Sequence, residues 1–161
     1  MNNLKKLEQK HKELGEEIAR LKAENDDVWP KDGDEYFFID IEGEIINDIW
    51  RDFNFEKEML EAGNAFRTRE GAEKIVLRRK IETILMKHSR GFVPDWDNVY
   101  QNKFRLLIDT GYLVIRNSGV DTYGCTIFFE TSEKAETAKD EVIEKLGEKA
   151  LKQYLSGQLA A

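Results

Sequence analysis

The segment FRTREGAE, at residues 66–73, has a close counterpart in FETSEKAE, at residues 129–136. The two align without gaps at an offset of 63 residues and share the pattern F-x-T-x-E-x-A-E. In each, a phenylalanine that can close a strand precedes a threonine that can cap a helix. Acidic residues follow where a helix N-terminus favours them. The pattern therefore predicts a strand-to-helix junction that occurs twice, and it indicates architecture rather than catalysis.

A β-hairpin is predicted upstream of each junction. The strand-forming segments are rich in aromatic and branched residues, and a glycine lies in the turn between the two strands of each pair. An aromatic strand follows each hairpin and ends in the phenylalanine of the junction. The expected strands are residues 36–41 and 44–50 around Gly43, and residues 103–109 and 112–117 around Gly111.

Helices are predicted after both junctions and at two further places. The expected helices are residues 55–62 with Asn54 as the cap, 69–88, 132–146 and 148–155. We therefore predict an α+β domain at residues 29–161. It consists of two strand-strand-strand-helix repeats, about residues 36–90 and 103–155, with helices on one face of an antiparallel sheet.

Residues 1–28 predict a coiled-coil helix in front of this domain. Mostly aliphatic side chains recur at alternating spacings of three and four, which are the a and d positions of a coiled-coil heptad, and the other positions are nearly all charged or amide residues. The seam consists of Leu4, Leu7, His11, Leu14, Ile18, Leu21, Asn25 and Val28. Asparagine at an a position favours a parallel dimer of fixed register, so this seam is the predicted oligomer interface. The alternative is a helix that packs back on its own domain, which the narrow stripe disfavours.

Charge is distributed unevenly along the chain. Residues 31–62 carry 11 acidic and three basic side chains, whereas residues 63–91 carry eight basic and three acidic ones. Each block could bind a partner of opposite sign, or the two could face each other across the fold. The candidate acidic surface is Asp32, Asp34, Glu35, Glu42, Glu44, Asp48, Asp52, Glu56, Glu58 and Glu61. The candidate basic contact is Arg78, Arg79 and Lys80.

The sequence lacks the residue patterns of the common catalytic and metal sites. It contains two histidines, His11 and His88, and one cysteine, Cys125. No nucleophile-histidine arrangement, zinc-type spacing, phosphate-binding glycine motif or nucleotide fingerprint is apparent. Asp95 and Asp97 lie in a run without the glycine and distal glutamate of a calcium loop. We therefore expect a protein that is not an enzyme and that uses no metal or cofactor.

The composition favours a soluble protein of a reducing compartment. The net charge of −7 argues against a general nucleic-acid binder and against a polybasic membrane anchor. No apolar run approaches the ~18 residues of a membrane-spanning helix. A single cysteine forms no intramolecular disulfide. We therefore expect a cytoplasmic protein without a membrane partner, for which direct binding of nucleic acid is disfavoured.

Several motifs resemble those of a known protein family. They are residues 36–40 (YFFID) with Gly43, residues 63–73 (GNAFRTREGAE), residues 95–96 (DW), residues 126–129 (TIFF) and residues 146–154 (LGEKALKQY). Over about residues 29–154 the chain resembles a family of small phage and prophage proteins of Gram-positive bacteria, in which a coil often precedes the domain. Gly71 stands where a second glutamate is common in the family. The resemblance assigns no active residue to this chain.

The leading hypothesis is a phage-encoded, non-enzymatic binding protein that self-associates through the coil and inhibits a host defence factor in the host cytosol. As in anti-CRISPR proteins that occupy a nucleic-acid channel, residues 32–61 would imitate DNA phosphates in front of a cleft lined by lysine and arginine. The partner would then be a nucleic-acid-binding effector nuclease. One alternative is a structural or assembly accessory of the phage. Another is a dimeric DNA-binding regulator that uses Arg78, Arg79 and Lys80.

Overall fold

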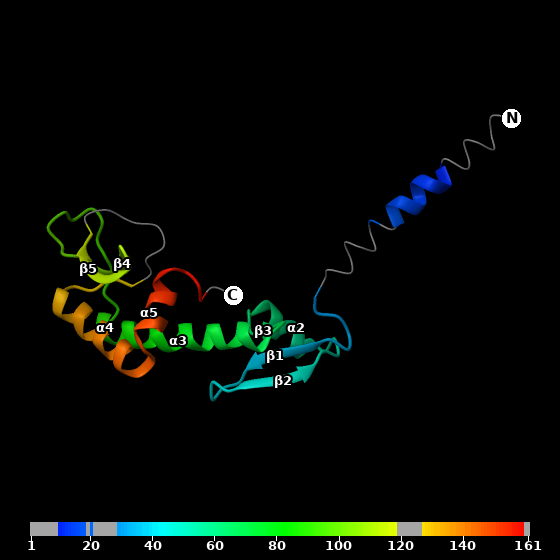
Figure 1. The fold of residues 1–161 in the computed structure, drawn as a ribbon, viewed down its shortest axis with the longest axis horizontal. Coiled ribbons are helices and arrows are strands. Elements are labelled where there is room, and N and C mark those ends of the chain that lie inside the picture. The colour runs from blue at the N-terminus through cyan, green and yellow to red at the C-terminus, as the bar shows by residue number, and fades with distance from the viewer. Residues whose placement is uncertain (1–9, 19, 21–28, 119–126, 160–161) are drawn as a thin grey trace. The chain divides into compact units, whose positions relative to one another are not determined.

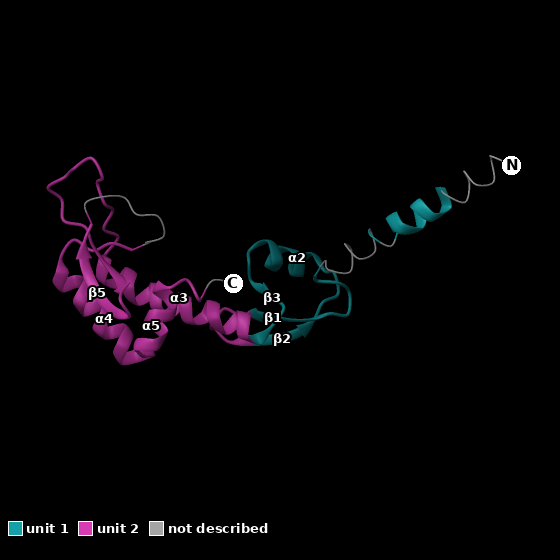
Figure 2. Ribbon diagram, turned by 45° about the horizontal axis from the view of Figure 1, so that its top comes forward, with its two compact units in different colours: residues 1–38, 46–69 teal, residues 39–45, 70–161 magenta. Residues whose placement is uncertain are grey.

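The structure is a computed structural model that describes residues 10–18, 20, 29–118 and 127–159 of the 161-residue chain (Figure 1). The chain divides into two compact units (Figure 2). The first unit comprises residues 1–38 and 46–69, and the second comprises residues 39–45 and 70–161. Helices occur together with two small antiparallel sheets, so the predicted α+β class is confirmed.

The first unit contains a three-stranded sheet and one short helix. Strands β1 (Glu35–Ile39), β2 (Ile45–Ile49) and β3 (Ala65–Phe66) lie in the order β2-β1-β3, and helix α2 (Asn54–Glu61) connects β2 to β3. β3 runs antiparallel to β1, with Phe66 opposite Phe37. β2 is an edge strand, and three of its five side chains are exposed.

Aromatic side chains form the core of the first unit. Tyr36 is fully buried, and the edge of the Trp50 ring meets it at a centroid distance of 5.4 Å. Phe38 stacks on Tyr36 at 5.9 Å, and Phe66 is buried at the end of β3. Such pairs add to the free energy of folding beyond the apolar area that they bury.

The start of α2 differs from the prediction. Asn54 is the first helical residue, and Phe53 occupies the N-cap position. The carboxylate of Glu56 accepts hydrogen bonds from the backbone N–H of Phe53 at 2.8 Å and of Arg51 at 3.0 Å. Asn54 is therefore wrong as the cap, because a glutamate inside the helix satisfies the backbone donors that precede it.

The hairpin of the second unit is formed by β4 (Phe104–Asp109) and β5 (Tyr112–Asn117). Leu107 lies opposite Val114 in an antiparallel register. The two turn residues, Thr110 and Gly111, both have positive φ angles, 47° and 87°. A two-residue turn of this hand matches the twist of the strands that it joins.

Three helices pack with this hairpin in the second unit. They are α3 (Arg69–Ser89), α4 (Ser132–Leu146) and α5 (Glu148–Leu155), with Gly147 between the last two (Figure 1). The core is made of apolar side chains from all three helices, from the hairpin and from the segments around it. Its buried members include Ile81, Leu85, Leu106, Ile127, Phe129, Ala135, Ala138, Val142 and Leu151.

The two predicted junctions share local features. Phe66 and Phe129 are both buried, and Ala72 and Ala135 are both fully buried one turn into the helix that follows. Phe129 pairs antiparallel with Phe104 of β4, as Phe66 pairs with β1. The described strands nevertheless form two separate sheets rather than the single sheet that the sequence led us to expect.

Among the residues that the structure describes, no helix is both long enough and apolar enough to cross a bilayer.

Candidate functional site

Part of the predicted oligomer seam lies on an exposed helix. Residues 10–18 are helical, and the seam residues Leu14 and Ile18 have exposed fractions of 61% and 48%. His11 is exposed on the same helix. The other seam residues, Leu4, Leu7, Leu21, Asn25 and Val28, lie outside the described residues. In a single chain, two large aliphatic side chains of the seam therefore remain in contact with water.

Charged side chains flank these aliphatic residues on the same helix. Lys12 and Glu16 are 3.9 Å apart, and Arg20 donates to Glu17 at 2.7 Å. All four side chains are exposed, so the pairs add little to the stability of the helix. The helix thus combines a narrow apolar stripe with a charged remainder, as expected of a coiled-coil strand.

Glu56 is misplaced in the predicted acidic surface. Its side chain is fully buried, and it accepts the backbone hydrogen bonds of Arg51 and Phe53. The hydroxyl of Tyr36 is buried near this carboxylate and makes no hydrogen bond to the residues that the structure describes. Burial, followed by the charge of Glu56, raises the pKa of Tyr36 to about 12. Glu56 is therefore a structural residue, and its predicted place on an exposed acidic surface is wrong.

Four other acids of the first unit are engaged in local contacts. Asp34 accepts from a backbone N–H, Glu35 from an asparagine amide, Asp48 from a backbone N–H and an arginine, and Asp52 from a lysine. The backbone bond to Ile49, above all, holds the pKa of Asp48 below its usual range. These four carboxylates therefore already bind groups within the unit itself.

The remaining acids of the predicted surface are exposed. None of them has an ion-pair partner among the residues that the structure describes: Asp32, Glu42, Glu44, Glu58 and Glu61. Glu42 and Glu44 belong to the hairpin turn that is grouped with the second unit. The first unit thus contributes Asp32, Glu58 and Glu61 as acids available to another molecule.

Two aromatic side chains of the first unit are also exposed. Phe53 and Phe55 stack on each other at a centroid distance of 5.8 Å, yet about half of each side chain is exposed. Phe55 and Glu58 are three residues apart on α2 and share one side of the helix. Exposed aromatic residues with a charged border are typical of sites where protein partners bind.

The predicted basic contact is only partly available. Arg78 donates to Glu82 at 2.9 Å, and this hydrogen bond raises the pKa of Arg78. The Tyr154 hydroxyl donates to the same carboxylate oxygen of Glu82 at 3.5 Å. Arg79 and Lys80 are exposed. Arg78 therefore belongs to a contact between α3 and α5, which leaves two of the three cations facing solvent.

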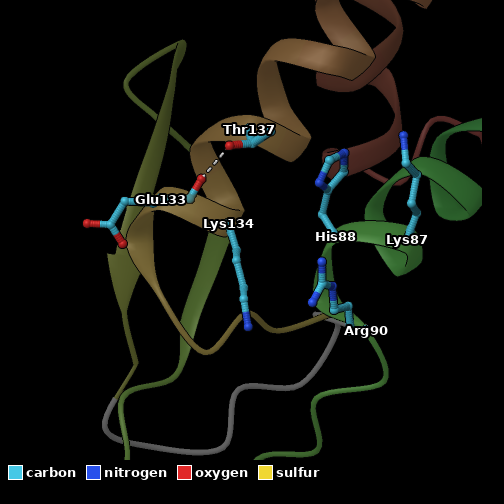
Figure 3. Close-up of a pocket in the computed structure, with 6 residues that line it drawn as sticks. All are labelled: Lys87, His88, Arg90, Glu133, Lys134 and Thr137. Carbon is cyan, nitrogen blue, oxygen red and sulfur yellow. Dashed lines mark hydrogen bonds between the residues drawn. The ribbon is translucent and has the colours of Figure 1, made fainter.

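An open pocket of about 500 Å³ lies between the end of α3 and the first turns of α4 (Figure 3). Three cations and one carboxylate line it, so its charge favours an anion over a cation. The carboxylate of Glu133 points away from the neighbouring Lys134 and Arg90 (Figure 3). The lining residues are Lys87, His88, Arg90, Glu133, Lys134 and Thr137. Sequence reasoning did not find this pocket, because its two halves are more than 40 residues apart in the chain.

Glu141 of α4 connects this helix to the end of α3, whose residues Lys87 and His88 line the pocket. Its carboxylate lies 2.5 Å from His88 Nε2, 2.9 Å from Lys87 Nζ and 2.6 Å from Lys145 Nζ. These hydrogen bonds, that of Lys145 first, lower the pKa of Glu141 to about 2. The carboxylate is therefore charged throughout the neutral range and holds the end of α3 against α4.

The low pKa of Glu141 predicts a specific sensitivity to acid. Its usual pKa of 4.5 applies in the unfolded chain, so the unfolded state binds a proton first as the pH falls. The stability that Glu141 contributes is present above pH 4.5 and is lost as the pH falls toward 2. We expect the variant Glu141→Gln to lose less stability than the wild type between pH 6 and pH 3, measured by urea unfolding.

The neighbouring Glu144 provides the matched control for this prediction. It is exposed on the same helix. The variant Glu144→Gln removes the same charge without removing the contacts to His88 and Lys87, so its acid sensitivity should equal that of the wild type. A Glu141→Gln profile parallel to the wild-type profile would show that the contacts do not shift the titration.

Within the described ranges, no group of three or more histidine, cysteine, aspartate or glutamate side chains could hold a metal ion. Asp95 and Asn98, which the sequence places in a polar loop, accept hydrogen bonds from backbone N–H groups of that loop.

Comparison of the chain with protein-family models, with curated proteins and with solved structures gives no match.

Proposed function

We propose that this protein is a binding protein without catalytic activity, which self-associates through its N-terminal helix and binds a basic partner through its first unit. The exposure of Leu14 and Ile18 on an otherwise charged helix is the observation that carries the proposal. A second helix that covered these side chains would remove apolar surface from water. A dimer of the predicted heptad seam provides that cover.

Self-association would also stabilise the N-terminal helix. A single helix in water gains little stability from helix propensity alone, even when its residues are good helix formers. The ion pairs of Lys12 and Arg20 are exposed and contribute little. Burial of the seam against a second copy supplies the missing stabilisation, and Asn25 then sets the register of a parallel dimer.

The first unit supplies the partner-binding surface of the proposal. The exposed acids Asp32, Glu58 and Glu61 attract a surface rich in lysine and arginine, and the Phe53–Phe55 stack offers apolar anchors on the same unit. Exposed carboxylates compete with nucleic-acid phosphates for a basic cleft. The resemblance to small phage proteins makes a nuclease of a host defence system the partner class to examine first.

The two halves of the domain are proposed to follow one strand-strand-strand-helix plan. In both, the segment before the junction pairs antiparallel with the first strand of the preceding hairpin. In both, an alanine six residues after the phenylalanine is fully buried. A shared scaffold of this kind allows the two halves to carry different surfaces on a similar backbone.

Capture experiments with matched variants test partner binding. The full chain is used as bait in a lysate of a Gram-positive bacterium, and captured proteins are identified by mass spectrometry. We expect a nuclease or another defence protein that a DNA duplex displaces from the bait. The variant Glu58→Gln/Glu61→Gln should capture at least fivefold less of it, because two charges of the surface are removed.

The control removes two charges from the second unit. Asp140→Asn/Glu144→Gln changes exposed acids of α4 and leaves the first unit intact, so capture should be unchanged. Recovery of no nuclease or other defence protein by the wild-type chain would contradict the proposal. Equal losses in the two double variants would show that net charge alone, rather than this surface, governs capture.

A further inference from the structure

In the second unit, the buried Lys103 binds the backbone of the loop of residues 92–102. Lys103 has an exposed fraction of only 3%, and its ammonium group donates to the carbonyl oxygens of Asn98 at 2.8 Å and Gln101 at 3.1 Å. The same group lies 5.5 Å from the centre of the Trp96 ring. Burying an ammonium group is unfavourable unless such contacts compensate for lost hydration. The lysine therefore ties the backbone of the loop to the start of β4.

Further contacts fix the shape of the loop. Gln101 Oε1 accepts from the backbone N–H of Asp95 at 2.6 Å, and Asn98 Oδ1 accepts from that of Tyr100 at 3.0 Å. The edge of the Trp96 ring packs on Phe128 at 5.3 Å, which anchors the loop to the segment before the second junction. The ammonium group of Lys103 and the indole of Trp96 thus pack inward, and two amide side chains bind the backbone of the loop.

Three apolar side chains of the same loop face solvent. The exposed fractions of Val93, Val99 and Tyr100 are 78%, 82% and 93%. Single exposed apolar residues are common on protein surfaces. Here, however, three of them occur on one short loop, among exposed polar residues, while the side chain of the neighbouring Lys103 is buried. The contacts of the buried lysine hold these apolar groups on a fixed backbone.

The charges on the loop define the kind of partner that it fits. Asp95 and Asp97 are exposed, and residues 91–102 contain no lysine or arginine. Acidic side chains repel nucleic acids and anionic membranes and attract cationic protein surfaces. We infer that the loop of residues 92–102 is a preorganised docking surface for a protein partner that offers an apolar pocket bordered by lysine or arginine side chains.

Preorganisation is the physical advantage of this construction. A loop that is already ordered loses little conformational entropy when it binds, so more of its contact energy appears as affinity. Tyrosine is favoured in such surfaces because it provides a large contact area with few rotatable bonds. This surface lies in the second unit and is independent of the acids of the first unit, so either interaction can fail without the other.

A random peptide library selected on the full chain tests the inference. The expected peptides place an aromatic or aliphatic residue next to lysine or arginine. Their affinity is then measured for variants of the chain. Val99→Ser/Tyr100→Ser should weaken binding at least tenfold, because it removes the apolar contact without altering buried residues. Tyr112→Ser is the matched control and should bind as the wild type, since Tyr112 is 73% exposed but lies on β5.

A second variant tests preorganisation separately from contact. Lys103→Met leaves Val99 and Tyr100 in place but removes the hydrogen bonds to Asn98 and Gln101. We expect three- to tenfold weaker peptide binding, together with faster hydrogen exchange in the loop. If Lys103→Met does not fold, Gln101→Ala removes the acceptor for Asp95 and should change both quantities in the same direction.

Three outcomes would overturn the inference. One is a selection that yields no peptide dependent on Val99 and Tyr100. Another is an equal loss of binding in Tyr112→Ser, which would show general surface adhesion. The third is binding of phosphatidylcholine vesicles that is lost in Val99→Ser/Tyr100→Ser, because the loop would then be a membrane contact rather than a protein contact.

Discussion

Replacing Glu56 with alanine is expected to lower the free energy of unfolding by about 3 kcal/mol. The substitution leaves the partly buried backbone N–H groups of Arg51 and Phe53 without their acceptor and removes a side chain that is fully buried in the same unit as Tyr36. Each unsatisfied buried donor costs about 1–3 kcal/mol. Urea unfolding of the full chain at pH 7, followed by tryptophan fluorescence, measures the change because Trp50 lies in the same core.

Two further variants separate the role of the carboxylate from that of helix composition. Glu56→Gln keeps the size of the side chain and one acceptor oxygen, so its cost should be about 1 kcal/mol. Glu58→Ala removes an exposed glutamate from the same helix and should change stability by less than about 0.5 kcal/mol. A Glu56→Ala variant as stable as Glu58→Ala would contradict the assignment of Glu56 as a buried cap.

Replacing Leu14 and Ile18 together with serine is expected to convert the proposed dimer into single chains. A dimer would bury four of these side chains, and each contributes about 1.5 kcal/mol or more when it leaves water. The dissociation constant should therefore rise roughly 10⁴-fold. Light scattering over a range of protein concentrations measures the molar mass directly, and the folded domain should retain its circular dichroism spectrum.

The control for this experiment changes the outer side of the same helix. Lys12→Ser/Glu16→Ser introduces the same residue twice and lowers helix propensity by a similar amount, but it leaves Leu14 and Ile18 in place. Its molar mass should equal that of the wild type. A wild-type chain that remains a monomer at all concentrations would remove self-association from the proposed function.

Residues close to one another in the sequence made the elements predictable. The aromatic and branched residues on both sides of Gly111 predicted β4 and β5, and the F-x-T pattern predicted the start of α4. Thr131 caps that helix by accepting from the backbone N–H of Lys134 at 3.2 Å. Gly147, with a φ angle of 90°, ends α4 where the sequence indicated. Such signals are local because capping and turn formation depend on neighbouring residues.

Burial of charged side chains was beyond sequence reasoning. Glu56 occurs among exposed acids, and only the packing of α2 against the aromatic core shows that its carboxylate is enclosed. Lys103 likewise precedes an ordinary strand, yet its ammonium group is held by carbonyl oxygens of the preceding loop. No periodicity marks either residue, because the partners that compensate for their burial are backbone groups, which every residue carries.

The sequence by itself determined the class of the fold, the positions of its strands and helices, and an apolar stripe on a charged N-terminal helix. These follow from residue spacing and local backbone preference, which operate within a few residues. The tertiary structure decided which of the charged residues are structural and which are available to a partner. It buried Glu56 and Lys103, engaged Arg78 with Glu82, and left Glu58 and Glu61 exposed. Desolvation depends on everything that packs around a charge, so its outcome emerges only when distant segments meet.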